Sequence, residues 1–132
     1  MFRIISIALI GLGLLACDNQ AMSVEGKWAW FDVAACEGDL DTIEFAGATF
    51  TRRFQGEVTR VGRDLAYQQT DSQGGPRITA HYQWVLQDTS RTVSITFEQQ
   101  SNDVLIYRGS EIDGQVPPSA AETMGRELYR CS

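Results

Sequence analysis

The residue types that most often carry enzyme chemistry are sparse in this sequence. His81 is the only histidine, and the polar residues Thr79 and Gln83 flank it on an alternating segment. A histidine base needs a nucleophile and an orienting partner, and no G-x-S-x-G or H-E-x-x-H pattern supplies them. No two carboxylates are fixed at a separation that would suit glycoside hydrolysis. We therefore predict a non-enzymatic protein with no catalytic residues, no metal and an exposed His81.

An acidic run follows Cys36 and consists of Glu37, Asp39, Asp41 and Glu44. Such oxygen ligands suit Ca²⁺, but the sequence contains no D-x-[DN]-x-[DN]-G loop. A solvated loop is therefore the favoured interpretation, and a contact site for a cationic partner is the alternative.

Five arginines are concentrated in the middle of the chain, namely Arg52, Arg53, Arg60, Arg63 and Arg77. Arginine pairs well with anions, so on adjoining strands these residues could meet lipid headgroups or an anionic glycan. Scattered surface charge is the simpler interpretation, and we favour it.

Aromatic residues occupy many positions that we expect to face inward. The candidate ligand-binding residues are Trp28, Trp30, Tyr82 and Trp84, with Tyr67 and Phe97 as further inward aromatics. They could line a cavity for an apolar ligand such as an acyl chain. Because small barrels are normally filled by their own side chains, a packed core is the favoured interpretation.

These residues lie on short segments that alternate apolar and polar side chains. The clearest segment is 77–87, whose inward face would carry Ile78, Ala80, Tyr82, Trp84 and Leu86. Segment 92–98 repeats the pattern, and weaker segments lie at 27–32, 42–45, 49–54, 57–61, 64–70 and 104–109. About eight strands broken by turn residues predict an all-β domain, a small antiparallel barrel or half-barrel.

A short C-terminal helix is expected after the strands. Pro117 and Pro118 end the strand pattern, and Ser119 with Glu122 forms an S-x-x-E capping box. Helical spacing then gives this helix one face made of Met124, Leu128 and Cys131.

The first sixteen residues have the features of a signal peptide. Arg3 precedes an apolar run that extends from Ile4 to Ala16. This run is shorter than the roughly 20 residues that span a bilayer, and it has the length of a signal-peptide hydrophobic region.

The end of this segment, Leu14-Leu15-Ala16-Cys17, resembles the lipobox of bacterial lipoproteins. The resemblance implies cleavage before Cys17 and a covalent lipid on that cysteine, with no other cofactor. Two or more acyl chains would anchor the protein firmly, because each buried CH₂ contributes about 0.8 kcal/mol. Ordinary secretion, with Cys17 as a plain cysteine, is the alternative.

The same resemblance places the protein in the bacterial cell envelope, anchored by lipid and facing the periplasm. Asp18 resembles the signal that retains enteric lipoproteins in the inner membrane, so that membrane is slightly favoured. The expected organisation is a signal peptide (1–16), the lipidated cysteine and a tether (17–23), and a β-barrel-like domain (24–132).

Two cysteines remain once Cys17 carries lipid. Cys36 and Cys131 lie near opposite ends of the expected domain, and exported compartments are oxidising. No C-x-x-C motif points to a metal instead. We predict a Cys36–Cys131 disulfide closing a loop of about 95 residues, which would stabilise the fold by at most about 4.7 kcal/mol.

Gly26-Lys27-Trp28 opens the first expected strand and resembles the G-x-W of lipocalins and related small barrels. In that family the tryptophan plugs one end of the barrel and a C-terminal arginine packs over it. Arg126 or Arg130 would take that position here. The resemblance implies a carrier of a lipid or another hydrophobic ligand.

Composition and charge exclude two broad classes. The chain has 11 Lys+Arg and 17 Asp+Glu, a net charge of −6, and loss of Arg3 leaves 10 against 17, or −7. An acidic protein suits nucleic acid poorly, and a chain with 43% hydrophobic residues is unlike a disordered one.

We therefore predict a membrane-anchored, non-enzymatic binding or interaction module whose partner is an unknown protein or a hydrophobic ligand. The alternatives are a lipocalin-like carrier and an acidic inhibitor of a cationic cell-wall hydrolase such as lysozyme. The chain resembles bacterial lysozyme inhibitors in size, acidity and its expected disulfide.

Overall fold

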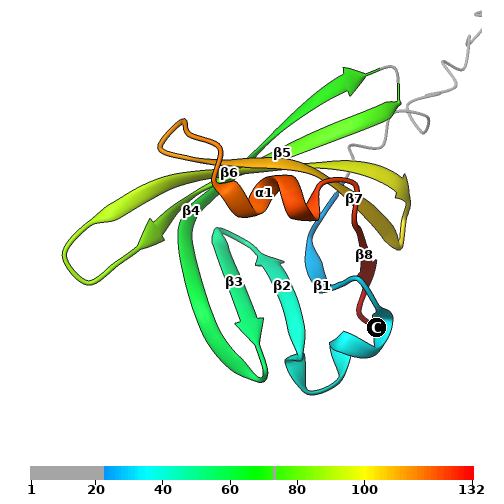
Figure 1. The fold of residues 1–132 in the computed structure, drawn as a ribbon, viewed down its shortest axis with the longest axis horizontal. Coiled ribbons are helices and arrows are strands. Elements are labelled where there is room, and N and C mark those ends of the chain that lie inside the picture. Colours follow the sequence, from blue (N-terminus) through cyan, green and yellow to red (C-terminus); the bar gives the residue numbers. More distant parts are fainter. Residues whose placement is uncertain (1–22, 73) are drawn as a thin grey trace, which may run out of the picture.

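A computed structural model describes residues 23–72 and 74–132. The predicted signal peptide, Cys17 and Asp18 lie outside the described residues. Within the described part, eight antiparallel strands form a closed barrel in which β8 returns to pair with β1 (Figure 1). The all-β prediction is confirmed, and the barrel is closed rather than half-open. The strands are β1 (Gly26–Trp30), β2 (Asp41–Ala46), β3 (Thr49–Phe54), β4 (Glu57–Ser72), β5 (Gly75–Val85), β6 (Ser90–Ser101), β7 (Val104–Ile112) and β8 (Glu127–Arg130).

The alternating segments 77–87 and 92–98 become the centres of β5 and β6. Their apolar residues pair across the interior, with Tyr82 opposite Val93 and Ile78 opposite Phe97. All four side chains are buried, as strict alternation on a one-sided sheet requires.

The two segments expected at 57–61 and 64–70 are one long strand, β4, so Gly62 and Arg63 form no turn. The pairing with β5 shifts register between Arg63 and Ala66, which marks an irregularity that bends the strand without ending it. Gly62 is required here because a Cβ would lie 2.3 Å from Cδ2 of Tyr82.

The helix α1 (Pro118–Thr123) is confirmed but shorter than expected. The capping box does not form, since Pro117 is the N-cap and makes no side-chain cap bond. Gly125 has a φ of +81°, which turns the chain, and residues 127–130 then pair with both β1 and β7. Leu128 therefore lies in a strand, because β8 closes the barrel and supplies hydrogen-bond partners to the open edges of both β1 and β7.

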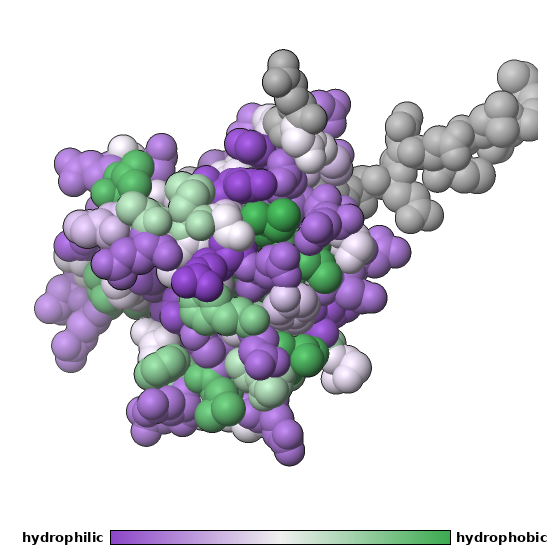
Figure 2. Space-filling model, turned by 45° about the vertical axis from the view of Figure 1, so that its right-hand side comes forward, coloured by the Kyte–Doolittle hydropathy of each residue, from purple (hydrophilic) through white to green (hydrophobic). Residues whose placement is uncertain are grey.

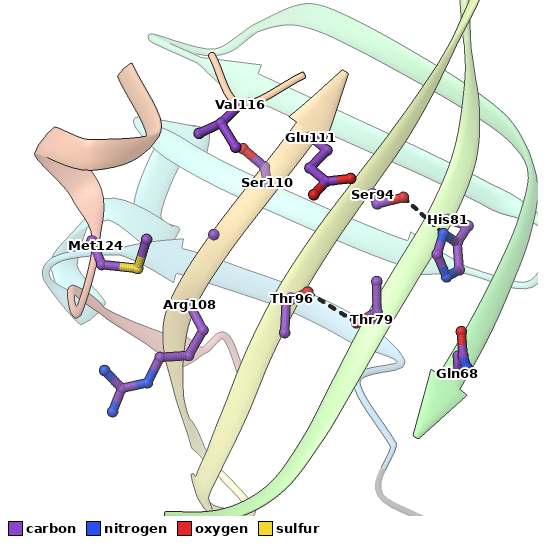
Figure 3. A pocket seen from close by; sticks show the side chains of 11 residues that line it. Gln68, Thr79, His81, Ser94, Thr96, Arg108, Ser110, Glu111, Val116 and Met124 are labelled. Atoms are coloured by element: carbon purple, nitrogen blue, oxygen red, sulfur yellow. Dashed lines mark hydrogen bonds between the residues drawn. The ribbon is translucent and has the colours of Figure 1, made fainter. Parts of the chain in front are cut away.

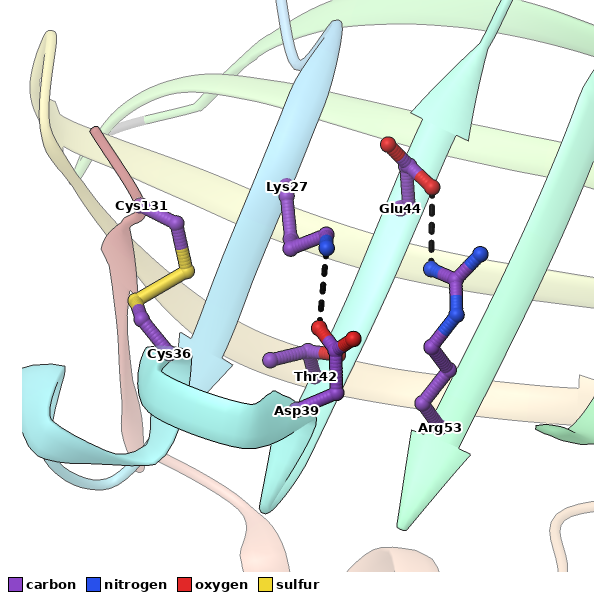
Figure 4. Close-up of polar contacts among 7 residues, drawn as sticks. All are labelled: Lys27, Cys36, Asp39, Thr42, Glu44, Arg53 and Cys131. Carbon is purple, nitrogen blue, oxygen red and sulfur yellow. Dashed lines mark hydrogen bonds and ion pairs between the residues drawn. A yellow bond between two sulfur atoms is a disulfide. The ribbon is translucent and has the colours of Figure 1, made fainter. Parts of the chain in front are cut away.

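A 3₁₀ segment, η2 (Val33–Asp39), links β1 to β2. Cys36 in η2 forms the predicted disulfide with Cys131, just beyond β8, with the two Cα atoms 5.6 Å apart (Figure 4). This bond fixes the connection between β1 and β2 against the C-terminal end of the chain.

The acidic run is not simply a solvated loop. Lys27 Nζ lies 2.8 Å from Asp39 Oδ1, and Arg53 lies 2.9 Å from Glu44 (Figure 4). Arg52 lies 3.4 Å from Asp41. The solvated-loop interpretation has these carboxylates facing water. The β2–β3 hairpin and η2 instead bring the basic side chains of Lys27, Arg52 and Arg53 close to them.

Aromatic side chains fill most of the barrel interior. The largest fully buried side chains are Trp28, Tyr82, Phe45, Phe50 and Phe97. The rings of Phe50 and Tyr82 stack with centroids 4.3 Å apart, and Phe97 packs edge-on against Phe45. This packing agrees with the favoured interpretation of the aromatic residues as core.

One face of the molecule is predominantly polar (Figure 2). The face drawn in Figure 2 is largely hydrophilic, with hydrophobic side chains dispersed among polar ones. Exposed apolar residues include Val116 and Val33, at 65% and 58%. Across residues 23–72 and 74–132, none of the helices has the length and apolar character to cross a bilayer.

Candidate binding site at the barrel mouth

The two ends of the barrel are built differently. We call the end occupied by Trp28 and Arg130 the closed end. We call the other end, where β1 and β7 finish and α1 packs, the mouth (Figure 1). The mouth holds a cavity of about 260 Å³. Its lining combines aromatic residues (Trp30, Phe31, Tyr107), arginines (Arg52, Arg60), aliphatic residues (Val93, Ile95, Ile112) and the α1 residues Ala120 and Thr123.

At the closed end the polar groups are satisfied within the protein. Trp28 is fully buried, and its Nε1 donates to the carbonyl oxygen of Val24 at 2.8 Å. Arg130 lies over the Trp28 ring, with Cζ 4.2 Å from the centroid. This is the position that the lipocalin resemblance implied for Arg126 or Arg130. Arg126 instead lies 5.6 Å from the Phe31 ring.

Arg130 also ties three chain segments together. Its Nε donates to the carbonyl oxygen of Asn102 at 2.9 Å, and its Nη1 donates to that of Glu25 at 2.7 Å. Asp103 lies 3.6 Å from the guanidinium. The closed end is therefore a structural plug in which the Trp28 indole and the Arg130 guanidinium are both tied to backbone carbonyl oxygens.

At the mouth, Trp30 points into the barrel two residues further along β1. It is 6% exposed, and its ring packs edge-on against Tyr107 at 5.4 Å between centroids. Its Nε1 is buried and has no hydrogen-bond partner among the described residues. Such orphan buried donors are rare in folded proteins and call for an explanation.

Arg52 and Arg60 face the interior of the mouth and lie opposite each other on β3 and β4. Arg52 is also the cross-strand neighbour of Ile43 on β2, and the Ile43 side chain is buried in the core. Because directly opposed residues point to the same face of a sheet, Arg52 points inward as well. The prediction of scattered surface charge is therefore wrong for these two arginines. Like charges placed directly opposite each other across a sheet are destabilising.

One carboxylate offsets this charge incompletely. Burial raises the pKa of Asp41, and the nearby Arg52 only partly opposes that shift. Arg52 is thus paired with an acid whose ionised form is itself disfavoured by burial.

Arg60 forms no ion pair with any carboxylate in the part of the chain that the structure describes. Its Nη1 donates to the hydroxyl of Tyr82 at 3.2 Å, and its guanidinium stacks on Trp84 at 3.9 Å from the ring centroid. Burial also raises the pKa of Tyr82, which outweighs the opposing effect of Arg60. Tyr82 is therefore a neutral acceptor, and the charge of Arg60 is not cancelled.

The four candidate ligand-binding aromatics do not converge on one cavity. Trp28 is part of the plug, and Tyr82 is stacked in the core. Trp84 is half-buried beneath Arg60, and only Trp30 lines the mouth.

Sequence reasoning missed the two arginines and Tyr107 as candidate site residues. Arg52 lies two residues after Phe50, whose side chain is buried, so the alternation of the strand places Arg52 on the inward face and a signal was present. Tyr107 and α1 carry no such signal, because they reach the mouth only through barrel closure.

A second cavity of about 400 Å³ lies on the outer face of the sheet (Figure 3). Thr79 and Thr96 are 2.9 Å apart there, and His81 Nδ1 lies 2.8 Å from the hydroxyl of Ser94. His81 is thus half-buried and hydrogen-bonded, which corrects the expectation that it is exposed and idle. These cross-strand pairs use their polar groups on each other and stabilise the sheet.

In residues 23–72 and 74–132, no three His, Cys, Asp or Glu side chains gather as a metal site would need. Comparisons with protein families, characterised proteins and solved structures found no match, so the proposed function rests on sequence features and geometry alone.

Proposed function

We propose that this chain is a lipid-anchored, non-enzymatic binding module of the bacterial envelope and that its binding site is the barrel mouth. The observation that carries the proposal is a cavity lined by Trp30, whose indole N–H has no acceptor, and by Arg60, which has no ion pair, among the residues that the structure describes. Concave sites with a few convergent polar groups among apolar residues are the usual form of small-ligand sites.

The envelope location is supported by two sequence features. Leu14-Leu15-Ala16-Cys17 resembles a lipobox, and a disulfide between Cys36 and Cys131 suits an oxidising compartment. Replacement of Cys17 by Ser should release the protein from the membrane fraction or leave it unprocessed. Unchanged processing and membrane partition would contradict the anchor.

A binding role is favoured over catalysis by the chemistry of the lining. As far as the described residues show, the mouth is lined by no histidine, cysteine or carboxylate that could act as base or nucleophile. Arginines, hydroxyls and aromatic rings can orient a ligand without reacting with it.

The two alternatives gain less support. A carrier of long lipids needs a deep cavity, and the space below the mouth is filled by Phe50 and Tyr82. The acidic run is the natural contact for a cationic target of an inhibitor, and its residues Asp39, Asp41 and Glu44 are already paired with basic side chains.

The proposal is tested by closing the mouth. Ser119 lies on α1 at the rim and is exposed, so Ser119→Trp should obstruct the cavity without disturbing the core. Ser101→Trp places the same bulk at the opposite end of β6 from the mouth residue Val93. Each full-length protein is isolated in lipid nanodiscs from cell envelopes, and the co-purifying small molecules are identified by mass spectrometry.

We expect the wild type and Ser101→Trp to retain the same compound and Ser119→Trp to lose it. Equal retention by both variants, or no compound in the wild type, would contradict the mouth as the binding site.

A further inference from the structure

The charge arrangement of the mouth is incomplete without an anion. Arg52 and Arg60 are a directly opposed like-charge pair on the inner face of β3 and β4. Asp41 is the only carboxylate within ion-pair distance of either arginine among the described residues, and it reaches only Arg52. The mouth therefore holds surplus positive charge, although the whole chain has a net charge of −6.

The Trp30 indole N–H is a second, independent feature that indicates a ligand with a hydrogen-bond acceptor. The Trp30 indole can only donate a hydrogen bond. Trp30 lines the same cavity, and its buried Nε1 has no protein acceptor in the described chain. Trp28 on the same strand has its acceptor, the carbonyl oxygen of Val24. A ligand oxygen could accept the hydrogen bond of the Trp30 indole, as the carbonyl oxygen of Val24 accepts that of Trp28.

The size of the mouth limits the rest of the ligand. Its volume of about 260 Å³ lies below the range of roughly 300–1,000 Å³ that holds drug-sized molecules. Tyr107, Ile95 and Ile112 offer an aromatic and aliphatic wall. A short aromatic or aliphatic group fits this wall, and a long acyl chain does not.

From these observations, and resting on the proposed function, we infer that the mouth binds a small organic carboxylate. Arg60 and Arg52 hold the carboxylate, the Trp30 N–H contributes a further hydrogen bond, and a short apolar body packs against Tyr107 and Ile95. Arginine suits this ligand because its planar guanidinium matches carboxylate geometry.

The test compares two probes of the same shape, 3-phenylpropionate and its neutral analogue 3-phenylpropionamide. Binding to the full-length protein in nanodiscs is measured by isothermal titration calorimetry, with protein-free nanodiscs as the blank. We expect the carboxylate to bind at least about tenfold more tightly than the amide, because it alone forms charge-assisted hydrogen bonds.

Arg60→Met should weaken 3-phenylpropionate binding by at least about tenfold. Arg63→Met is the matched control, since it removes the same charge from the same strand at a side chain that is 64% exposed. It should leave the affinity unchanged. Trp30→Phe, which keeps a ring in place, should weaken binding of the carboxylate more than binding of the amide, because a hydrogen bond to an ionised acceptor is the stronger one. It provides the same test if Arg60→Met does not fold.

Equal affinity for the two probes, or an unchanged affinity in both Arg60→Met and Trp30→Phe, would overturn the carboxylate inference while leaving the mouth as a binding site. Failure of both probes to bind would also overturn it, and the Ser119→Trp comparison then decides separately whether the mouth binds anything. Binding of a short acidic peptide at the mouth, without binding of 3-phenylpropionate, would overturn it in favour of a protein partner.

Discussion

Trp28 and Trp30 lie two residues apart on β1, and both point into the barrel close to arginines. At the closed end the indole N–H reaches Val24 and Arg130 is held by two carbonyl oxygens. At the mouth the indole N–H has no protein acceptor among the described residues, and Arg60 has no carboxylate.

The difference separates a structural role from a binding role for the same residue types. Buried donors that the fold itself satisfies contribute to stability, whereas buried donors without partners cost stability unless a ligand completes them. A tryptophan or an arginine in a barrel is therefore informative only together with its hydrogen-bond partners.

The largest expected effect concerns the disulfide, which holds the strand that carries Arg130. Replacing both Cys36 and Cys131 by Ser should lower the free energy of unfolding by up to about 4.7 kcal/mol, because the unfolded chain gains entropy. Urea unfolding measures this loss. A loss below about 1 kcal/mol would show that the closed end needs no covalent support.

The next largest effect on the free energy of unfolding is expected when Arg130 and Arg60 are replaced in turn. Arg130→Met should cost about 1–3 kcal/mol, since it removes hydrogen bonds to two backbone carbonyls and the contact with Trp28. Arg60→Met should cost less, because relief of the repulsion with Arg52 offsets the loss of its hydrogen bond to Tyr82 and its contact with Trp84. Equal losses in urea unfolding would remove the distinction between the two ends.

An effect of similar size is expected to distinguish Trp28 from Trp30. Trp28→Phe should cost about 1–3 kcal/mol, partly because it leaves the Val24 carbonyl without its partner. Trp30→Phe should cost less than Trp28→Phe, because no hydrogen bond is broken and an orphan donor is removed. Thermal unfolding of the two variants compares them directly, and a larger loss for Trp30→Phe would contradict this account.

The smallest effect lies outside both ends, on the outer side of β1. The hydrogen bond from Lys27 lowers the pKa of Asp39 below its usual value of 3.8. Its ionised form therefore stabilises the fold above about pH 3.8, and this contribution is lost as the pH falls through the folded-state pKa. Asp39→Asn should show a weaker loss of stability over this acid range than the wild type, and parallel stability curves would contradict the assignment.

The sequence predicts those features of the fold that depend on local alternation or simple cysteine counting. β5 and β6 follow the alternation around Tyr82 and Phe97, and the disulfide follows from two remaining cysteines. Helical spacing predicts helix through Leu128 and Cys131, whereas the structure has strand β8 at Glu127–Arg130. Its strand character comes from pairing with β1 and β7, which no local pattern encodes.

The binding site was predictable only in part. Trp30 was among the candidate residues, but Arg52 and Arg60 were placed on the surface, where arginine is usually found. Recognising the site needs the β3–β4 register that sets these arginines opposite each other, together with barrel closure that brings Tyr107 and α1 to the same cavity.

The central claim is that the mouth, and not the closed end, is the binding site. The most direct test follows the indole ¹⁵N–¹H signals of Trp28 and Trp30 by NMR during titration with 3-phenylpropionate. We predict that the Trp30 signal moves progressively as its N–H gains an acceptor, while the Trp28 signal stays in place. An unmoved Trp30 signal, or an equal shift of the Trp28 signal, would contradict the account.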